Sequence, residues 1–391
     1  MAEMTKDDVL LTITKENLET GLRGYPVGYC TTSSVDPQKG LFYVGKSLAD
    51  MAFWNPENVI FLLFNGREGS DAEIKTFKED LIKRSHISPE VIKHIHALPR
   101  HVHPMKIFCM ALLILGSLEG KNDYREDALN LIAKLPQLTA TVINFHGSWG
   151  GTKPPQPELG YMENFTHMLN TPNADPKALT HAFKLFNVLH FDHGGGNLSA
   201  FTGKAVSSGL EDMYGSLTAA MCALAGPRHG KANQECLEFV HLLIKKLGAN
   251  ATEDTVKNEI SRMLDNNEIV FGFGHAVLRV EDPRASIFYS EAQKLYPDNP
   301  LVKMALTLRA AGPDILKQNP KVSDPFPNVD AISGSFLSAS GFPYPHYFTV
   351  LFGLSRCIGI SRQITYERLE ARDGKGVPIY RPKFFYKQPS S

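Results

Sequence analysis

The sequence contains little that would suit a secreted, membrane-spanning or nucleic-acid-binding protein. Only five cysteines occur among 391 residues, and none forms a CxxC pair or another spacing typical of metal sites. We therefore expect buried free thiols. The longest apolar run, around residues 105–116, is too short to cross a bilayer. Acidic and basic side chains balance at 41 each, which provides no global attraction to nucleic acid.

The N-terminal segment also lacks the features of a targeting signal. Its first residues, MAEMTKDDVLLTITKENLE, include several acids and no long apolar core. They are typical neither of a secretory signal nor of an arginine-rich transit peptide. On this ground we expect a cytoplasmic protein.

The sequence does contain a succession of helix signals. Residues 105–116 are apolar nearly all round and predict a buried helix, and residues 347–369 predict a long helix with apolar faces. Residues 1–60 are instead rich in glycine, threonine and aromatics, and GLRGYPVGYC and GLFYVG indicate short strands or turns. The expected fold class is all-α with a small β element near the N-terminus. Helix starts with a capping residue followed by proline are seen at Ser88-Pro89, Asp175-Pro176 and Asn299-Pro300.

Three histidines lie in glycine-bounded breaks between predicted helices. They occur in LHFDHGGGN, LAGPRHGKAN and FGFGHAVLRVEDPR, at positions His193, His229 and His275. Glycine allows a ligand to approach the backbone, and a tight loop between ordered elements can hold an imidazole at the edge of a cleft. Each histidine alone has an ordinary alternative as a capping or solvent-facing residue. His190 and His193 also have the HxxH spacing of a metal pair, but no third ligand lies close in sequence, so no metal is expected.

Arginines near these histidines favour a carboxylate-bearing ligand. Arg279 and Arg284 follow His275 directly, and a guanidinium binds a carboxylate through two parallel hydrogen bonds. Arg356 lies on an otherwise apolar helical face, in TVLFGLSRCIGI, where its charge must be paired with an internal acid or a bound anion. No acid occurs in that stretch before Glu367, which favours the bound anion.

Asp330 is placed in the first turn of a predicted helix by the segment DPFPNVDAISG. The ordinary interpretation is a carboxylate that stabilises the helix dipole. A general base for a weakly acidic C–H needs basicity instead, so burial would have to offset the lowering of its pKa by the dipole. The sequence leaves that balance open.

Taken together, these segments resemble a known family. GFGHAVLRVEDPR closely resembles the signature of the citrate synthases, and the other four motifs follow in that family's order, from about His103 to YRPK near the C-terminus. The resemblance implies a helical homodimer with two domains per subunit: a large domain, 1–231 and 341–391, and a small domain, 232–340. It also implies condensation of acetyl-CoA with oxaloacetate and hydrolysis of citryl-CoA, without a metal or a cofactor other than the CoA thioester.

The resemblance also implies a role for each matching residue. Asp330 would take a proton from the acetyl methyl group. His229 would donate a hydrogen bond to the thioester oxygen, and His275 would polarise the carbonyl of oxaloacetate. The carboxylates of oxaloacetate would be held by His193, Arg284, Arg356 and, from the neighbouring subunit, Arg381.

Two departures from the family pattern concern the grip on CoA. Val44 stands in GLFYVG where the family usually has an arginine, and no arginine occurs between Ile143 and Gly151. Arg279 and Lys321 remain as candidates for binding the CoA phosphates. Two alternatives stay open: a 2-methylcitrate synthase that uses propionyl-CoA, and a citrate-synthase-like protein that binds or assembles without turnover.

Overall fold

Helices make up most of the computed structural model, which describes residues 8–319, 322 and 324–388. Within these residues the only sheet is three-stranded and antiparallel, with Ser33 opposite Tyr43 and Phe42 opposite Ser47. The expected all-α class with a small β element near the N-terminus is confirmed. GLFYVG supplies a strand and a turn, whereas GLRGYPVGYC forms turns and extended chain. The strands are β1 Ser33–Asp36, β2 Gly40–Tyr43 and β3 Lys46–Ser47.

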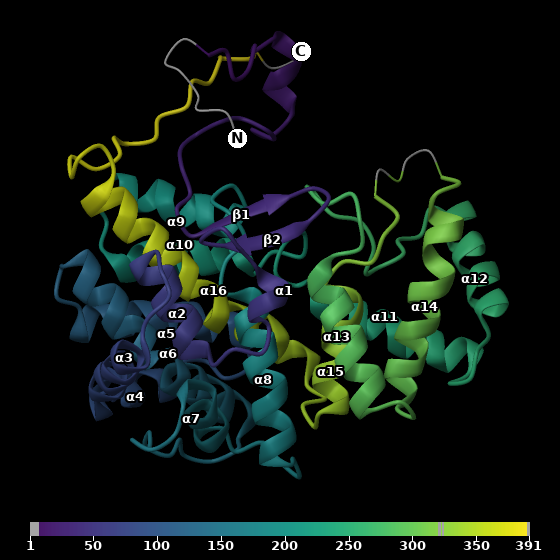
Figure 1. Cartoon of the computed structure of the whole chain (residues 1–391), viewed down its shortest axis with the longest axis horizontal. Coiled ribbons are helices and arrows are strands. Elements are labelled where there is room, and N and C mark those ends of the chain that lie inside the picture. The colour runs from purple at the N-terminus through teal and green to yellow at the C-terminus, as the bar shows by residue number, and fades with distance from the viewer. Residues whose placement is uncertain (1–7, 320–321, 323, 389–391) are drawn as a thin grey trace.

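The helices form a large body and, to its right in Figure 1, a smaller group. The body contains α1 Leu48–Met51, α2 Pro56–Asn65, α3 Asp71–Arg84, α4 Pro89–His96, α5 Pro104–Glu119, α6 Tyr124–Gly147, α7 Tyr161–Met168, α8 Pro176–His190, α9 Leu198–Ser208, α10 Met213–Leu224 and α16 Phe348–Thr365. The smaller group contains α11 Ala232–Leu247, α12 Glu253–Asp265, α13 Pro283–Leu295, α14 Pro300–Leu316 and α15 Asp330–Ala339. Shorter turns are η1 Lys15–Glu19, η2 Pro345–Tyr347 and a π-helical turn, Tyr366–Glu370.

The predicted capping residues begin their helices as expected. The Ser88 hydroxyl accepts a hydrogen bond from the backbone N–H of Val91, and Asp175 accepts from that of Lys177. Asn299 caps α14 in the same way. In each helix proline occupies the first turn, where its missing N–H would have had no helical partner.

Two hydrophobic cores lie in this fold. The smaller core joins α11, α12 and α14 through residues such as Val240, Ile260 and Leu308. The larger core fills the body and continues into α13 and α15 through Phe288 and Phe336. Because the larger core runs across both parts, the division at 231/232 and 340/341 stays a prediction.

Helix α16 runs through the larger core and is buried along nearly its whole length. At Gly359 its backbone approaches the end of α8, and the Gly359 N–H donates to the carbonyl of Phe191 over 3.1 Å. A Cβ at this position would lie 2.4 Å from that oxygen and 2.6 Å from Cβ of Asp192. Only glycine therefore allows α16 to contact the loop that follows α8 this closely.

The close approach predicts that Gly359→Ala destabilises the protein by about 1–3 kcal/mol, because the backbone must move to relieve the overlap. This loss exceeds the ~1 kcal/mol that alanine gains over glycine in a helix. Gly353→Ala is the matched control on the same helix, since its Cβ would meet only the movable ends of Phe108, Met221 and Met105 at 3.0–3.3 Å. Urea unfolding followed by circular dichroism measures both. Equal stability of the two variants would contradict the expectation.

The cysteines are free thiols, as expected, but not all of them are buried. Cys109, Cys236 and Cys357 lie in the interior, whereas Cys30 is half-buried and Cys222 is exposed. The expectation of burial is wrong for Cys222 because it lies on the outer face of α10. None of the helices in the described part of the chain is both long and apolar enough to cross a membrane.

Candidate active site

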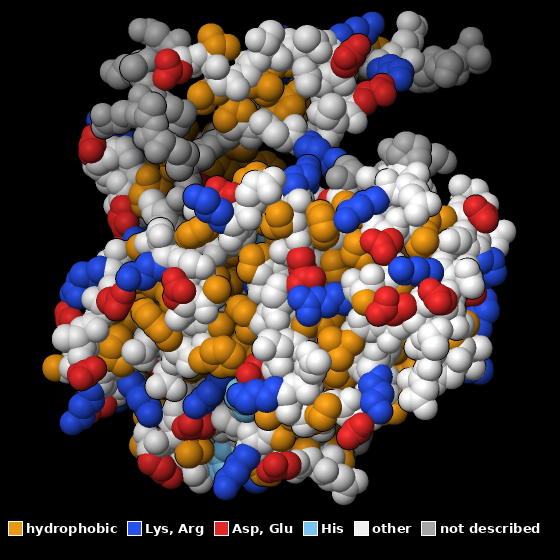
Figure 2. All heavy atoms as spheres, turned by 45° about the vertical axis from the view of Figure 1, so that its right-hand side comes forward, with side chains coloured by type: hydrophobic (Ala, Val, Ile, Leu, Met, Phe, Trp, Pro, Cys, Tyr) orange, Lys and Arg blue, Asp and Glu red, His pale blue; other side chains and the backbone are white. Residues whose placement is uncertain are grey.

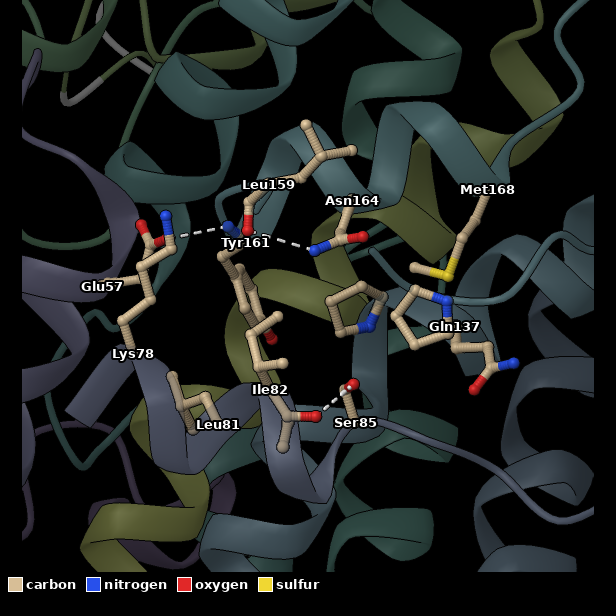
Figure 3. A pocket seen from close by; sticks show the side chains of 13 residues that line it. Glu57, Lys78, Leu81, Ile82, Ser85, Gln137, Leu159, Tyr161, Asn164 and Met168 are labelled. Carbon is tan, nitrogen blue, oxygen red and sulfur yellow. Dashed lines mark hydrogen bonds between the residues drawn. The ribbon is translucent and has the colours of Figure 1, made fainter. Parts of the chain in front are cut away.

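A partly open hollow in the body, shown in Figure 3, has too little free volume to be a binding site. It lies among α2, α3, α6 and α7, and its volume of about 20 Å³ suits one water molecule. Two of its polar groups are already paired: Glu57 accepts from the Tyr161 N–H at 2.8 Å, and the Ser85 hydroxyl donates to the Ile82 carbonyl at 2.8 Å. The chemistry therefore has to be sought at the loops that carry the histidines.

The loop after α8 is fixed by the buried carboxylate of Asp192. Its Oδ2 accepts from the hydroxyls of Thr32 and Ser33, the latter at 2.8 Å. Its Oδ1 accepts from the His193 N–H at 2.9 Å and from Nε2 of Gln363 at 2.7 Å. Because every partner donates, these bonds favour the ionised carboxylate, although burial raises the pKa of Asp192. The N-terminal hairpin, α16 and the histidine loop thus meet at one side chain.

His193 projects from this loop beside His275, another histidine that the sequence predicts for the site. Its ring centroid lies 5.2 Å from that of His275. Its Nε2 is buried and has no hydrogen-bond partner among the described residues. Burial, together with Arg284 and Arg356, holds the pKa of His193 well below its usual value. The result is a neutral imidazole with one nitrogen available to a ligand.

His229 lies on the short connection between α10 and α11. Its Nε2 accepts from the backbone N–H of Ser199 at 3.2 Å and lies 2.8 Å from the Ser199 hydroxyl. Burial lowers the pKa of His229 to about 4, and Arg356 adds to the effect. The ring is therefore neutral, and a backbone donor at Nε2 assigns its proton to Nδ1. His229 presents an N–H donor through Nδ1.

His275 has the opposite tautomer. Its Nδ1 accepts from the backbone N–H groups of Val277 at 3.0 Å and Leu278 at 2.8 Å. Burial lowers the pKa of His275 to about 4, with Arg284 contributing. The single ring proton consequently lies on Nε2. His275 thus presents an N–H donor through Nε2.

The His275 segment pairs with the segment that leads to Asp330. Phe273 and Pro327 form an antiparallel bridge. The Asn328 amide donates to the carbonyl of Gly274 at 3.0 Å, and its backbone N–H donates to that of Gly272 at 2.9 Å. Both glycines have positive φ, at 85° and 87°, which side chains would disfavour. Two motifs that are distant in the sequence thereby become adjacent.

Asp330 is the first residue of α15, as expected. Burial raises the pKa of Asp330 to about 6, and repulsion from Asp282 adds to it, while Arg284 and Arg356 oppose it. Desolvation therefore outweighs the attraction of both guanidinium groups. A carboxylate with this pKa is ionised at neutral pH and still basic enough to accept a proton.

Two buried guanidinium groups complete the cluster. Arg356 is 2% exposed and Arg284 is 4% exposed. Arg356 donates to the His190 carbonyl at 3.2 Å and lies over the Phe352 ring at 4.7 Å. Burial lowers the pKa of Arg356 to about 10, so it remains a cation. A pair of buried cations beside neutral imidazoles forms a receptor for a small dianion.

Comparison with known proteins agrees with this chemistry. The family model described as citrate synthase, C-terminal domain, matches residues 21–383. This chain belongs to the citrate synthase family. The expected family resemblance is confirmed, and the chain is an enzyme of that family.

Curated relatives and solved structures span nearly the whole chain. The mitochondrial citrate synthase of Citrus maxima is 36% identical over 93% of this chain and 80% of its own length. The peroxisomal citrate synthase of Saccharomyces cerevisiae is 32% identical over 97% and 85%. The ternary complex of carboxymethyl coenzyme A and oxaloacetate with citrate synthase from Thermoplasma acidophilum is similar in structure, with a TM-score of 0.82, 26% identity and coverage of 95% and 96%.

The expectation of a cytoplasmic protein is contradicted by these citrate synthase relatives. Five of the matching proteins are named mitochondrial, and another is named peroxisomal. The expectation rested only on the composition of the first residues of the chain, which is a weaker indication of location than the names of whole-length relatives.

The structure brings together six of the seven residues predicted for condensation in the citrate synthase family. Mutual ring contacts or electrostatic interactions connect them. Arg381 lies apart, on the exposed C-terminal segment, where its neighbour Tyr380 bonds to Ser208 and Glu367 of the same chain. The six that converge are His193, His229, His275, Arg284, Asp330 and Arg356.

The two residues predicted to bind CoA phosphates have different outcomes. Arg279 is exposed, and its Nη1 donates to the carbonyls of His275 at 3.2 Å and Leu278 at 2.6 Å. Its guanidinium therefore supports the turn that also holds His275. Lys321 lies outside the described residues.

Some supporting residues gave little sign of a role in the sequence. Ser199 orients His229, and Gln363 holds Asp192 from α16. A serine two residues after the capping Asn197 and a glutamine seven residues after Arg356 are common in helices. Only the helix phase of Gln363, two turns from Arg356 on the same face, was a usable signal.

The depressed histidine pKa values predict a pH dependence of stability. Because the pKa of His275 is about 4 in the folded chain and about 6.5 when unfolded, the folded state binds fewer protons between these values. The contribution of neutral His275 to the free energy of unfolding is complete above pH ~6.5 and is lost as the pH falls towards 4. Asp330, with its raised pKa, acts in the opposite direction over part of this range.

His275→Gln is therefore expected to lose less unfolding free energy than the unsubstituted chain between pH 7 and pH 5. Denaturant titrations at several pH values measure the slope. The exposed His241 on α11 is the matched control, as His241→Gln. Identical slopes for all three proteins would contradict the assignment of a buried neutral imidazole at position 275.

Proposed function

We propose that this chain condenses acetyl-CoA with oxaloacetate and hydrolyses the resulting citryl-CoA to citrate and CoA. The observation that carries the proposal is the complementary pair of neutral histidines, His229 with its donor at Nδ1 and His275 with its donor at Nε2. They share buried surroundings with a basic carboxylate and two guanidinium groups. A complex with oxaloacetate and a CoA analogue in the Thermoplasma acidophilum enzyme supports the same substrates here.

In the first step Asp330 removes a proton from the acetyl methyl group. The electron pair moves towards the thioester oxygen, where Nδ1–H of His229 donates a hydrogen bond. A fixed donor at such an oxygen accelerates related reactions by about 10²–10³. A positioned base adds about 10²–10⁴. The raised pKa of Asp330, about 6, reduces the difference between its pKa and that of the weakly acidic methyl group.

In the second step the enol carbon attacks the ketone carbonyl of oxaloacetate. Charge develops on the carbonyl oxygen, which accepts a hydrogen bond from Nε2–H of His275. Arg284 and Arg356 bind the substrate carboxylates, and the unpartnered Nε2 of His193 faces the same ligand. A water molecule then cleaves the thioester of citryl-CoA and releases CoA. These donors polarise both reacting carbonyls, so this mechanism needs no metal or cofactor other than the CoA thioester.

We propose in addition that the enzyme is a homodimer. The purple and yellow segments next to the two termini lie side by side beyond the body in Figure 1, and Figure 2 shows exposed hydrophobic side chains on this part of the molecule. Tyr29, Phe384 and Tyr386 are 72%, 89% and 88% exposed in the single chain. Contiguous exposed apolar surface marks an association site. A second copy would cover it and place Arg381 in the neighbouring active site.

We propose Arg279 as a ligand of the CoA phosphates. It is exposed, and its guanidinium lies against the carbonyl of His275, next to the proposed substrate site. Val44 and the loop 143–151 do not supply the arginines usual in the family. CoA binding in this chain therefore relies on a different set of cations.

The proposed reaction predicts release of CoA thiol from acetyl-CoA in the presence of oxaloacetate. Asp330→Asn, which keeps the shape but not the base, should fold normally and lose at least about 100-fold in kcat. A thiol-trapping assay measures both, with circular dichroism as the control of folding. A faster rate with propionyl-CoA would instead identify a 2-methylcitrate synthase, and no release with either donor would indicate a non-catalytic relative.

The proposed exchange of Arg381 between subunits predicts complementation. Arg381→Ala and Asp330→Asn homodimers should each be nearly inactive. Subunits mixed after mild dissociation should recover activity, because one site of each heterodimer combines an intact Asp330 with an intact Arg381. Lys383→Ala, two residues further along the exposed segment, is the control and should be active by itself. Absence of recovery in a verified heterodimer would show that Arg381 acts within its own chain or not at all.

A further inference from the structure

A buried carboxylate that the proposed mechanism does not use lies next to one of the substrate-binding arginines. Asp282 is 1% exposed and caps α13, where its Oδ1 accepts from the backbone N–H of Arg284 at 3.0 Å. Its backbone N–H donates to the carbonyl of Pro327 at 3.1 Å. Asp282 therefore joins the segment that carries His275 to the segment that leads to Asp330.

The same carboxylate accepts hydrogen bonds from one edge of the Arg284 guanidinium. Nε of Arg284 lies 3.1 and 3.2 Å from the two carboxylate oxygens, and Nη2 lies 2.7 Å from Oδ2. Both partners are almost completely buried. An arginine has a second edge, formed by Nη1 and the remaining Nη2 proton. The described residues place no hydrogen bond on Nη1, so this edge is available to a ligand carboxylate.

Asp282 also determines which carboxylate forms an ion pair with Arg284. The ionisable groups that act on Asp330 come from three helices: Asp282 and Arg284 at the start of α13, Arg356 on α16, and Cys236 on α11. Arg284 lowers the pKa of Asp330, and Asp282 raises it. Besides Asp282, Asp330 is a carboxylate whose charge acts on Arg284. Without the Asp282 carboxylate, Arg284 would be free to pair with the base. A direct ion pair there would reduce its basicity.

We propose that Asp282 is a positioning residue for the condensation: it orients Arg284 towards the substrate carboxylate and prevents Arg284 from pairing with Asp330. This inference rests on the proposed function, because it assigns the substrate site to Arg284 and the base to Asp330. The ordinary alternative is that Asp282 only caps α13.

Asp282→Asn separates the two roles. Asparagine caps helices as well as aspartate does and retains an oxygen for the Arg284 N–H, but it carries no charge for the guanidinium. Two effects are expected. The Michaelis constant for oxaloacetate rises at least tenfold. The acid limb of kcat/KM, which the pKa of Asp330 predicts near pH 6 in the unsubstituted enzyme, moves to lower pH.

Glu281→Gln is the matched control. Glu281 precedes Asp282 and has a similar set of bonds, to Arg309 at 2.6 and 2.8 Å and to Ser286, but it faces α14 and not the site. This variant should keep both parameters within about twofold of the unsubstituted enzyme. Normal kinetics in a folded Asp282→Asn protein, or equal effects of the two substitutions, would overturn the proposal.

Asp282→Glu covers the case in which the asparagine variant does not fold. It restores the charge but displaces it by one methylene group, so the acid limb should return to its original pH while the Michaelis constant for oxaloacetate stays raised. An unchanged Michaelis constant would overturn the proposal.

Calorimetric binding of oxaloacetate without acyl-CoA distinguishes failure of this inference from failure of the proposed function. An unsubstituted chain that releases no CoA disproves the reaction, whereas equal oxaloacetate affinity of the Asp282→Asn variant and the unsubstituted chain disproves the positioning role.

Discussion

Burial of two guanidinium groups in one cluster is the constraint on which the rest of the site depends. Removing such charges from water is costly unless negative groups compensate them. Asp282 meets Arg284 through a direct ion pair, whereas Arg356 bonds a backbone carbonyl and is attracted by Asp192 without an ion pair. Each guanidinium has a compensating aspartate and still has donor groups without a partner among the described residues, so it can bind a ligand carboxylate. The loops that carry the two aspartates must therefore be held accurately.

The same electrostatic setting determines the protonation of the reacting groups. Burial and the two arginines keep the imidazoles neutral, so each has one donor nitrogen, and backbone N–H groups choose which nitrogen it is. Burial also keeps Asp330 basic against two cations. A more open cluster would let solvent screen these effects, so the dense packing of α16 and α15 against the loops contributes directly to the chemistry.

Features set by local sequence were predictable, and features set by distant contacts were not. Proline-led caps and the apolar run of α5 define helices through neighbouring residues alone. The pairing of Asn328 with Gly274 joins segments 54 residues apart, which no periodicity indicates. The pKa of Asp330 depended on a contest between burial and dipole that needs three-dimensional surroundings. The family resemblance placed His275 and Asp330 in one site, but only the structure showed the pairing of their segments and the raised pKa of Asp330.

Helix α16 carries its site residues with fixed spacing. Phe352, Arg356, Gly359 and Gln363 recur every three or four positions, so they share one face, and they contact His229, the His190 carbonyl, the Phe191 carbonyl and Asp192 in turn. One inserted or deleted residue between them would rotate the remainder by about 100°. The interval from 352 to 363 is therefore closed to length variation, and divergence within this helix is restricted to exchanges of side chains.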